Sequence, residues 1–168
     1  MSQIHHKTLH NPIAVAGFQI RTTNTEELSG SGKIEQLWHR FFVENLAAQI
    51  PNRSSEDLYA VYSNYESDEN GAYDYLLGSP VTSIANLPAG VTYAAISTGD
   101  YAVVTTEKGS VKQVMQTAWR SIWNLSTAEL GGKRSFLTDY EIYDKRAADP
   151  ADAQVEIHLG LEPAPEQR

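Results

Sequence analysis

The stretch IEQLWHRFF, residues 34–42, has a counterpart 81 residues further along the chain, MQTAWRSIW, residues 115–123. In both stretches apolar residues recur at helical spacing, which predicts two amphipathic helices. The shift places Trp38 on Trp119, so each helix carries a tryptophan at the same position. Two helices of one kind in a single chain are the first sign of an internal duplication.

The residues after each helix extend the match. The same shift lays YAVY, residues 59–62, on YEIY, residues 140–143. A shift of 82 then lays Leu77-Gly78 on Leu159-Gly160. Both copies read as strand, helix, strand, strand, with turn residues closing each hairpin. A repeat this long predicts two supersecondary units rather than a solenoid.

We therefore predict a single domain over residues 1–168, made of two pseudo-symmetric repeats at about 11–78 and 92–160, with the linker 79–91 between them. Its 168 residues are enough for one well-buried core. About six strands and two main helices predict an α+β fold, with a mainly antiparallel sheet and a central ligand cleft between the halves. Residues 92–106 are expected to form one strand, with a break at Gly99.

Composition excludes several functional classes. The net charge of −8, without a cluster of lysines and arginines, argues against direct binding of nucleic acid. Without cysteine the chain has no disulfides, thiolate nucleophiles or zinc-thiolate sites. No apolar run reaches the length of a membrane span, and the start of the chain lacks the blocks of a signal peptide. We expect a cytoplasmic protein that does not engage a membrane.

The histidines indicate no metal site. His5, His6 and His10 are expected in a mobile terminus, and their spacing is not that of metal ligands. His158 alternates with Glu156, so the two are expected to form a pair at the surface.

The stretch DYEIYD, residues 139–144, holds the main candidate for function. Side chains alternate along a strand, so Glu141 and Tyr143 share one face. The first copy has Ala60 where the second has Glu141, and this difference indicates an asymmetric site. A glutamate that merely faces water on an exposed sheet is the competing interpretation, and the residues alone favour neither.

A carboxylate among aromatic rings is a site for a cation. Removing it from water costs several kcal/mol unless a counter-charge arrives, while ring faces add roughly 0.5–2 kcal/mol of cation–π attraction. The predicted ligand-binding residues are Glu141, Tyr143, Tyr62, Trp38, Trp119 and Trp123. Each tryptophan also lies on an apolar helix stripe, which for any single one of them favours a place in the core.

These features together resemble the GyrI-like effector-binding family, the ligand-sensing domain of many AraC-type and MerR-type bacterial regulators. The resemblance covers residues 12–163 and rests on the duplicated module, the tryptophan in each helix and the late strand YEIYD. It implies that Glu141 lies in an aromatic cleft and pairs with lipophilic, drug-like cations. It also implies a stand-alone module without a cofactor, with a separate DNA-binding regulator as a possible partner in transcription regulation.

Two alternatives stay open. Some members of the family are hydrolases of cyclopropane-bearing genotoxins, and in that case Glu141 and Tyr143 would be the catalytic residues, whereas a binding module has none. A more remote interpretation is a haem or tetrapyrrole carrier, because a similar duplicated architecture serves that purpose elsewhere.

Overall fold

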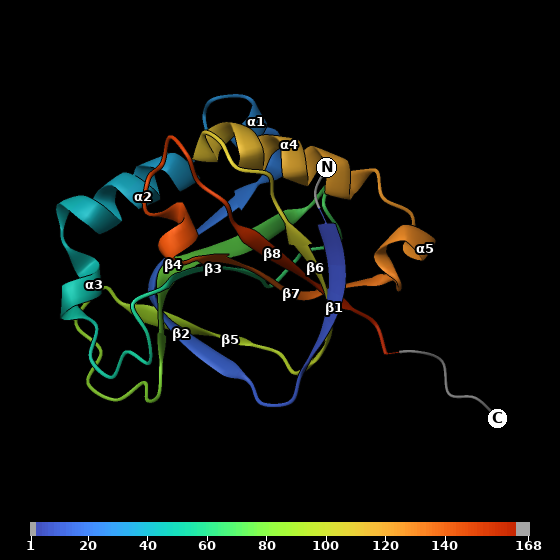
Figure 1. The fold of residues 1–168 in the computed structure, drawn as a ribbon. Coiled ribbons are helices and arrows are strands. Elements are labelled where there is room, and N and C mark those ends of the chain that lie inside the picture. Colours follow the sequence, from blue (N-terminus) through green and yellow to red (C-terminus); the bar gives the residue numbers. More distant parts are fainter. Residues whose placement is uncertain (1–2, 164–168) are drawn as a thin grey trace.

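A computed structural model describes residues 3–163, so residues 1, 2 and 164–168 of the expected domain lie outside the described part. Within it, eight strands form one antiparallel sheet in the order β1-β6-β8-β7-β3-β4-β2-β5 (Figure 1). The strands are β1 Gln3–Leu9, β2 Ile13–Thr23, β3 Leu58–Ser63, β4 Ala72–Val81, β5 Thr92–Ile96, β6 Gly99–Thr105, β7 Arg134–Tyr143 and β8 Glu156–Leu161. Together with the helices described in the next paragraph, this antiparallel sheet confirms the predicted α+β class.

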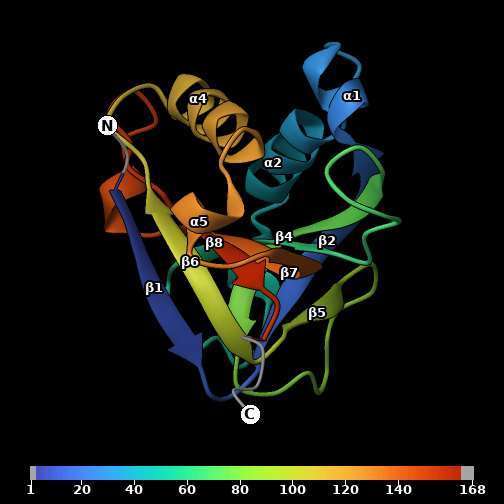
Figure 2. The same ribbon diagram turned by 90° about the vertical axis from the view of Figure 1, so that its right-hand side faces the viewer.

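Two long helices lie on the same side of this sheet (Figure 2). Helix α2 buries Leu37 and Phe41, and helix α4 buries Ala118 and Ile122 at the matching positions of the repeat. Both helices are therefore amphipathic, as predicted. The helical segments of residues 3–163 are α1 Asn24–Leu28, α2 Ile34–Val43, α3 Leu46–Gln49, α4 Val111–Trp123, α5 Thr127–Leu130 and a 3₁₀ turn at Lys145–Ala147. None of the described helices is long and apolar enough to cross a membrane.

The sheet is buried on both faces. Phe41 and Leu77 belong to the core under α2, and Ile122 and Leu159 belong to the core under α4. A third cluster occupies the opposite face of the sheet and is formed by Val15, Val61, Leu76, Ile96, Tyr101 and Tyr140. Since alternate residues of a strand point to opposite faces, Glu141 lies on the helix-covered face.

The strand order reads the same from either end when β1, β2, β3 and β4 are exchanged with β5, β6, β7 and β8. Strands β3 and β7 meet at the centre, and α2 and α4 occupy matching places in the chain. This order has the form expected of a duplicated module, while the limits of the two repeats stay a prediction. Strand β4 continues to Val81, so the first three residues of the predicted linker are strand.

The prediction of a mobile terminus was wrong for His5 and His6. Both lie in β1, which pairs with β6 from Gln3 to Leu9. Residues 92–106 form two strands with different neighbours, because β5 pairs with β2 and β6 pairs with β1 and β8. Gly99, with φ +133°, allows the chain to turn between them, a conformation that other residues rarely adopt. These two changes account for eight strands where about six were expected.

Candidate functional site

Glu141 lies near the centre of the sheet, and only 2% of its surface is exposed. Strand β7 holds it between Ile157 of β8 and Ala60 of β3. Both neighbouring strands are hydrogen-bonded to β7, so the backbone of Glu141 is fixed. The side chain projects into the layer between the sheet and the helices.

Three side chains donate hydrogen bonds to this carboxylate. The Tyr62 hydroxyl and the Trp119 indole N–H donate to Oε2, at 2.7 and 2.8 Å. The Tyr143 hydroxyl donates to Oε1 at 2.6 Å. All three donors are neutral, and no lysine, arginine or histidine of residues 3–163 forms an ion pair with Glu141. The structure therefore holds a buried acid that is hydrogen-bonded but has no counter-charge in the described chain.

Aromatic rings form the walls around the carboxylate. The Tyr62 ring centre lies 5.1 Å from Trp119 and 5.1 Å from Tyr75. Trp38 meets Tyr143 edge to face, with ring centres 4.7 Å apart, and its indole N–H donates to the Tyr75 hydroxyl at 2.9 Å. Side chains from both helices and both halves of the sheet therefore surround one acid.

The predicted site residues fall into two groups. Tyr62, Tyr143 and Trp119 contact Glu141 directly. Trp38 reaches it only through Tyr143 and Tyr75, and Trp123 lies against Trp119 with ring centres 6.5 Å apart. All three tryptophans are partly exposed, so they combine core packing with an accessible ring face. Tyr75, which is fully buried, is a member of the aromatic wall that the sequence did not indicate.

Ala60 and Glu141 are direct cross-strand neighbours at the centre of the strand order. These are the positions that the shift of 81 residues superimposes. Directly opposite residues of an antiparallel pair have Cβ atoms about 4.5–5.5 Å apart, so like charges there destabilise the sheet. The small side chain of Ala60 therefore leaves both space and freedom from repulsion for the acid beside it.

A second buried acid, Asp139, lies two residues before Glu141 on the same strand face and was not predicted. It is fully buried and accepts hydrogen bonds from Arg134 at 2.6 Å, from the Tyr65 hydroxyl at 2.5 Å and from the Gly160 N–H at 2.9 Å. Unlike Glu141, it has a cationic partner. The alternation of DYE, residues 139–141, is enough to place both acids on one face. The sequence does not indicate Arg134 as the partner of Asp139, because the strand pairing changes register between these two residues.

Burial decides the protonation chemistry of the site. Burial raises the pKa of Glu141 above its ordinary value, hydrogen bonds from Tyr143, Tyr62 and Trp119 oppose this, and the nearby charge of Asp139 adds to it. Burial, followed by the charge of Glu141, raises the pKa values of Tyr62 and Tyr143 well above normal. Both hydroxyls therefore keep their protons and remain donors at neutral pH.

His158 and Glu156 form the expected pair, but the histidine is buried rather than at the surface. His158 is 1% exposed, its Nε2 lies 2.9 Å from Glu156 Oε1, and its ring stacks on Tyr140 with centres 4.3 Å apart. Burial lowers the pKa of His158 to about 4, although the hydrogen bond and charge of Glu156 oppose the shift. The surface prediction was wrong because this face of the sheet carries its own core.

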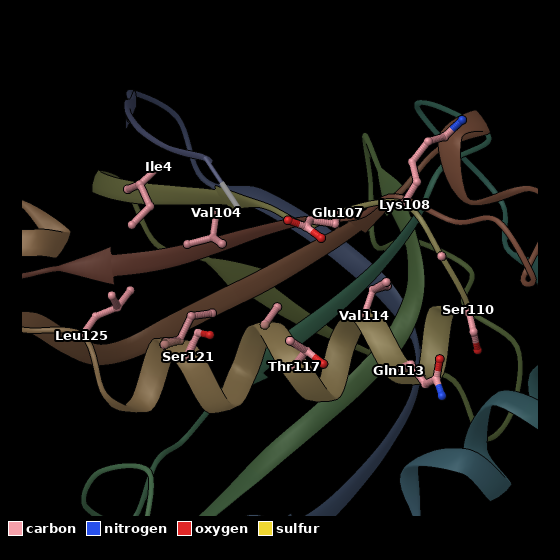
Figure 3. A pocket seen from close by; sticks show the side chains of 13 residues that line it. Ile4, Val104, Glu107, Lys108, Ser110, Gln113, Val114, Thr117, Ser121 and Leu125 are labelled. Atoms are coloured by element: carbon pink, nitrogen blue, oxygen red, sulfur yellow. The ribbon is translucent and has the colours of Figure 1, made fainter. Parts of the chain in front are cut away.

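A cavity beside α4 does not contain the predicted site. Its volume is ≈ 520 Å³, and it lies between α4 and the strands β1 and β6 (Figure 3). None of the six predicted ligand-binding residues lines it. At Glu141 the donor side chains themselves occupy the space in front of the carboxylate. The hydrogen-bonded acid, rather than the volume, identifies this place as a candidate site.

Comparison with known proteins places the chain in a family. A family model described as Cass2, integron-associated effector binding protein, matches residues 9–160. The chain belongs to this Cass2 family. YobU of Bacillus subtilis, a protein named as a transcriptional regulator, is 30% identical over 147 residues, which are 87% of this chain and 90% of YobU. The resemblance to effector-binding domains of bacterial regulators is thereby confirmed.

Solved structures agree with the Cass2 assignment. The integron cassette protein VCH_CASS2 from the mobile metagenome of Vibrio cholerae has 29% identity, a TM-score of 0.74 and coverage of 96% of this chain and 97% of its own. The structure of SAV2435 bound to tetraphenylphosphonium has a TM-score of 0.72 and covers 96% of this chain and 94% of its own. At 14% identity, the second match shows a shared fold only.

Proposed function

We propose that this chain binds lipophilic cations in the aromatic site around Glu141, with the carboxylate as counter-charge. The observation that carries the proposal is a buried glutamate whose hydrogen-bond donors, Tyr62, Tyr143 and Trp119, are all neutral. Asp139 on the same strand has Arg134 beside it. The same fold therefore neutralises one buried acid and leaves the other for a partner from outside.

The energetic argument compares burial with compensation. An ionised carboxylate removed from water loses several kcal/mol of hydration, and neutral donors return only part of it. A cation next to Glu141 would supply the missing charge, and the tryptophan and tyrosine faces would each add about 0.5–2 kcal/mol of cation–π attraction. A large apolar cation loses little hydration on entering such a site. Anions would be repelled by an acid whose charge is poorly screened.

Entry to the site requires side-chain movement. Tyr143, Trp119 and Trp38 are partly exposed, whereas Tyr62 and Tyr75 are buried. We infer that the first three rotate away from the carboxylate while the last two stay as its floor. These three side chains are partly exposed and pack at the edge of the core, so their rotation opens a path from the surface to the carboxylate.

The ligand found with SAV2435 supports the ligand class. That protein shares the fold, and its structure holds tetraphenylphosphonium, a lipophilic monocation. Its sequence identity of 14% is too low to transfer residue roles, so the argument for this chain rests on Glu141 and its neighbours.

The test compares a cation with a neutral molecule of similar shape. Tetraphenylphosphonium and triphenylphosphine oxide are titrated into the parent protein, Glu141→Gln and the matched surface control Glu66→Gln by calorimetry. Glu141→Gln should weaken binding of the cation by on the order of 2 kcal/mol, about thirtyfold in affinity, and should leave the affinity for the neutral compound within a few-fold of the parent's. The control should match the parent. Equal cation-to-neutral affinity ratios in the parent and Glu141→Gln would refute the proposal.

Hydrolysis of strained electrophiles is a second candidate, because Tyr143 and Glu141 are in contact at 2.6 Å. An acid hydrogen-bonded to a phenol is a suitable arrangement for activating water or protonating a leaving group. Incubation with a cyclopropane-bearing alkylating agent, followed by chromatography, separates the two functions. Consumption that requires both Glu141 and Tyr143 would establish an enzyme, and we expect the compound to persist.

The setting of the site is part of the same proposal. We place the protein in the cytoplasm, with a separate DNA-binding regulator as its partner. The regulator named among its relatives and the acidic charge of −8 support this. Co-purification of a DNA-binding protein that depends on tetraphenylphosphonium would test it.

A further inference from the structure

The cavity beside α4 lies on the side of that helix that does not carry Trp119. Its walls are α4 on one side and β6 with β1 on the other, and the side chains of both point into the same space (Figure 3). The volume of ≈ 520 Å³ falls within the range of small-molecule pockets, roughly 300–1,000 Å³. The site around Glu141 makes no use of this cavity.

The chemistry of the walls changes along the cavity. One end is mainly apolar and is formed by Ile4, Ile122 and Leu125, with the hydroxyl of Ser121 beside them. The other end carries Ser110 and Gln113, and Figure 3 shows these two ends on opposite sides of the view. Such a gradient suits an elongated molecule with one apolar and one hydrogen-bonding end.

Polar side chains along α4 are available to a ligand. Gln113, Thr117 and Ser121 line the cavity and form no side-chain hydrogen bond to another group of residues 3–163. The charged lining residues are one acid, Glu107, and one base, Lys108, and Lys108 also forms an ion pair at 3.7 Å with Asp152 outside the cavity. Both are exposed to solvent, so neither is a buried counter-charge of the kind that Glu141 provides.

The two halves of the chain show why the space exists. The shift of 81 residues places Ala118 on Leu37 and Ser121 on Arg40. In the first half Leu37 is buried, and the Arg40 guanidinium lies 3.8 Å from the centre of the Phe18 ring. In the second half both helix positions are small, and the matching groove is open.

The strand that packs under each helix also has a large side chain in the first half and a small one in the second. Phe18 faces Leu77 across β2 and β4, and Ala102 faces Leu159 across β6 and β8. Since Leu77 and Leu159 match in the repeat, Ala102 stands where the first half has Phe18. Three large side chains of one half therefore correspond to three small ones in the other. Ala118 and Ser121 line the cavity, and Ala102 lies in the core cluster beneath α4. Because packed interiors leave few voids, the smaller side chains open a groove that Phe18, Leu37 and Arg40 fill in the first half.

We propose that the cavity beside α4 is a second small-molecule site, which takes an uncharged amphipathic ligand. The apolar ring or chain of the ligand lies against Ile4, Ile122 and Leu125. Its hydroxyl or amide end bonds to the side chains of Gln113 and Ser110. This site is separate from the cation site, because its lining includes neither Glu141 nor any residue that contacts it.

The test uses N-phenyl-1-naphthylamine, an uncharged dye whose emission rises in apolar surroundings. It is titrated into the parent protein and into two variants that restore the residues of the first half, Ala118→Leu and Ser121→Arg. Ser121 is exposed, so its substitution leaves folding intact even if Ala118→Leu overpacks the core. Gln116→Arg is the matched control, since Gln116 is exposed on α4 and does not line the cavity. Circular dichroism verifies the fold of each variant.

The dye should bind saturably to the parent, to Gln116→Arg and to Glu141→Gln. Its affinity should fall at least tenfold in Ser121→Arg and in any folded Ala118→Leu protein. Saturating tetraphenylphosphonium should not displace it. The proposal is overturned if the parent does not bind the dye, if Ser121→Arg binds it as the parent does, or if Glu141→Gln or tetraphenylphosphonium abolishes binding.

Discussion

Replacing Glu141 by Gln should stabilise the unliganded protein at neutral pH. The amide has the shape of the carboxylate and can keep all three hydrogen bonds. Its oxygen can accept from Tyr62 and Trp119, and its NH₂ group can donate to the Tyr143 hydroxyl, which then acts as acceptor. The substitution therefore removes a charge without leaving a cavity or an unpaired polar atom.

The magnitude follows from two opposing contributions. Burying the carboxylate costs several kcal/mol. A hydrogen bond to a charged group contributes about 1 kcal/mol more than a neutral one, so three such bonds return about 3 kcal/mol. The raised pKa of Glu141 shows that burial outweighs the bonds. We expect Glu141→Gln to gain on the order of 1–2 kcal/mol, and each kcal/mol raises Tm by about 2–4 °C in a chain of this size.

The gain should depend on pH. An acid whose pKa is higher in the folded state binds its proton more tightly there, so the parent is most stable below the ordinary pKa of 4.5 and loses stability as pH rises through the folded pKa. The difference between variant and parent should therefore shrink as pH falls toward 4.5. Thermal and urea unfolding between pH 4.5 and 8 measure it, with the exposed Glu66→Gln as control. A variant less stable than the parent at pH 7.5, or a gain that does not change with pH, would refute this reasoning.

Three further predictions concern other buried groups. Arg134→Met leaves Asp139 buried without its cation and should cost about 3–5 kcal/mol in urea unfolding, whereas a loss below 1 kcal/mol would show that the acid finds other compensation. His158→Phe removes a histidine that stays neutral in the folded protein. The parent should lose stability as pH falls from 6.5 to about 4, and in the variant this loss should be smaller by about 3 kcal/mol. An unchanged dependence of stability on pH would contradict the lowered pKa of His158. Tetraphenylphosphonium should quench tryptophan emission in the parent and in Trp123→Phe but much less in Trp119→Phe, and equal quenching in all three would place the cation away from Glu141.

The architecture was largely predictable because the two helices of the repeat carry the same hydrophobic pattern. Trp38 and Trp119 lie on amphipathic stripes of equal phase, and that periodicity survives folding unchanged. Strand β1 was missed because the polar stretch around His5 has no alternation of its own, and its pairing with β6 joins residues about a hundred positions apart. Long-range pairing of an edge strand depends on a sheet that already exists, so local sequence carries little sign of it.

The centre of the site was predictable, and its details were not. Glu141 and Tyr143 share a strand face by simple alternation, and the repeat places Tyr62 at the position equivalent to Tyr143. Which tryptophan reaches the acid depends on how the helices cross the sheet. Trp119 donates a hydrogen bond to Glu141, whereas Trp38 donates to the Tyr75 hydroxyl. Their different bonds distinguish two residues that the sequence treats alike.

The cross-strand pair of Ala60 and Glu141 has a consequence for how such a site can arise. A dimer of two identical modules would carry the same residue at both positions, so it could offer either two facing carboxylates or none. Two would repel each other or share a proton, and the pair would then no longer match a ligand with one positive charge. Joining the modules in one chain allows each position to mutate alone. Recognition of a single charge at the midpoint of a nearly symmetric protein therefore depends on covalent fusion, because fusion is what permits an odd number of acids there.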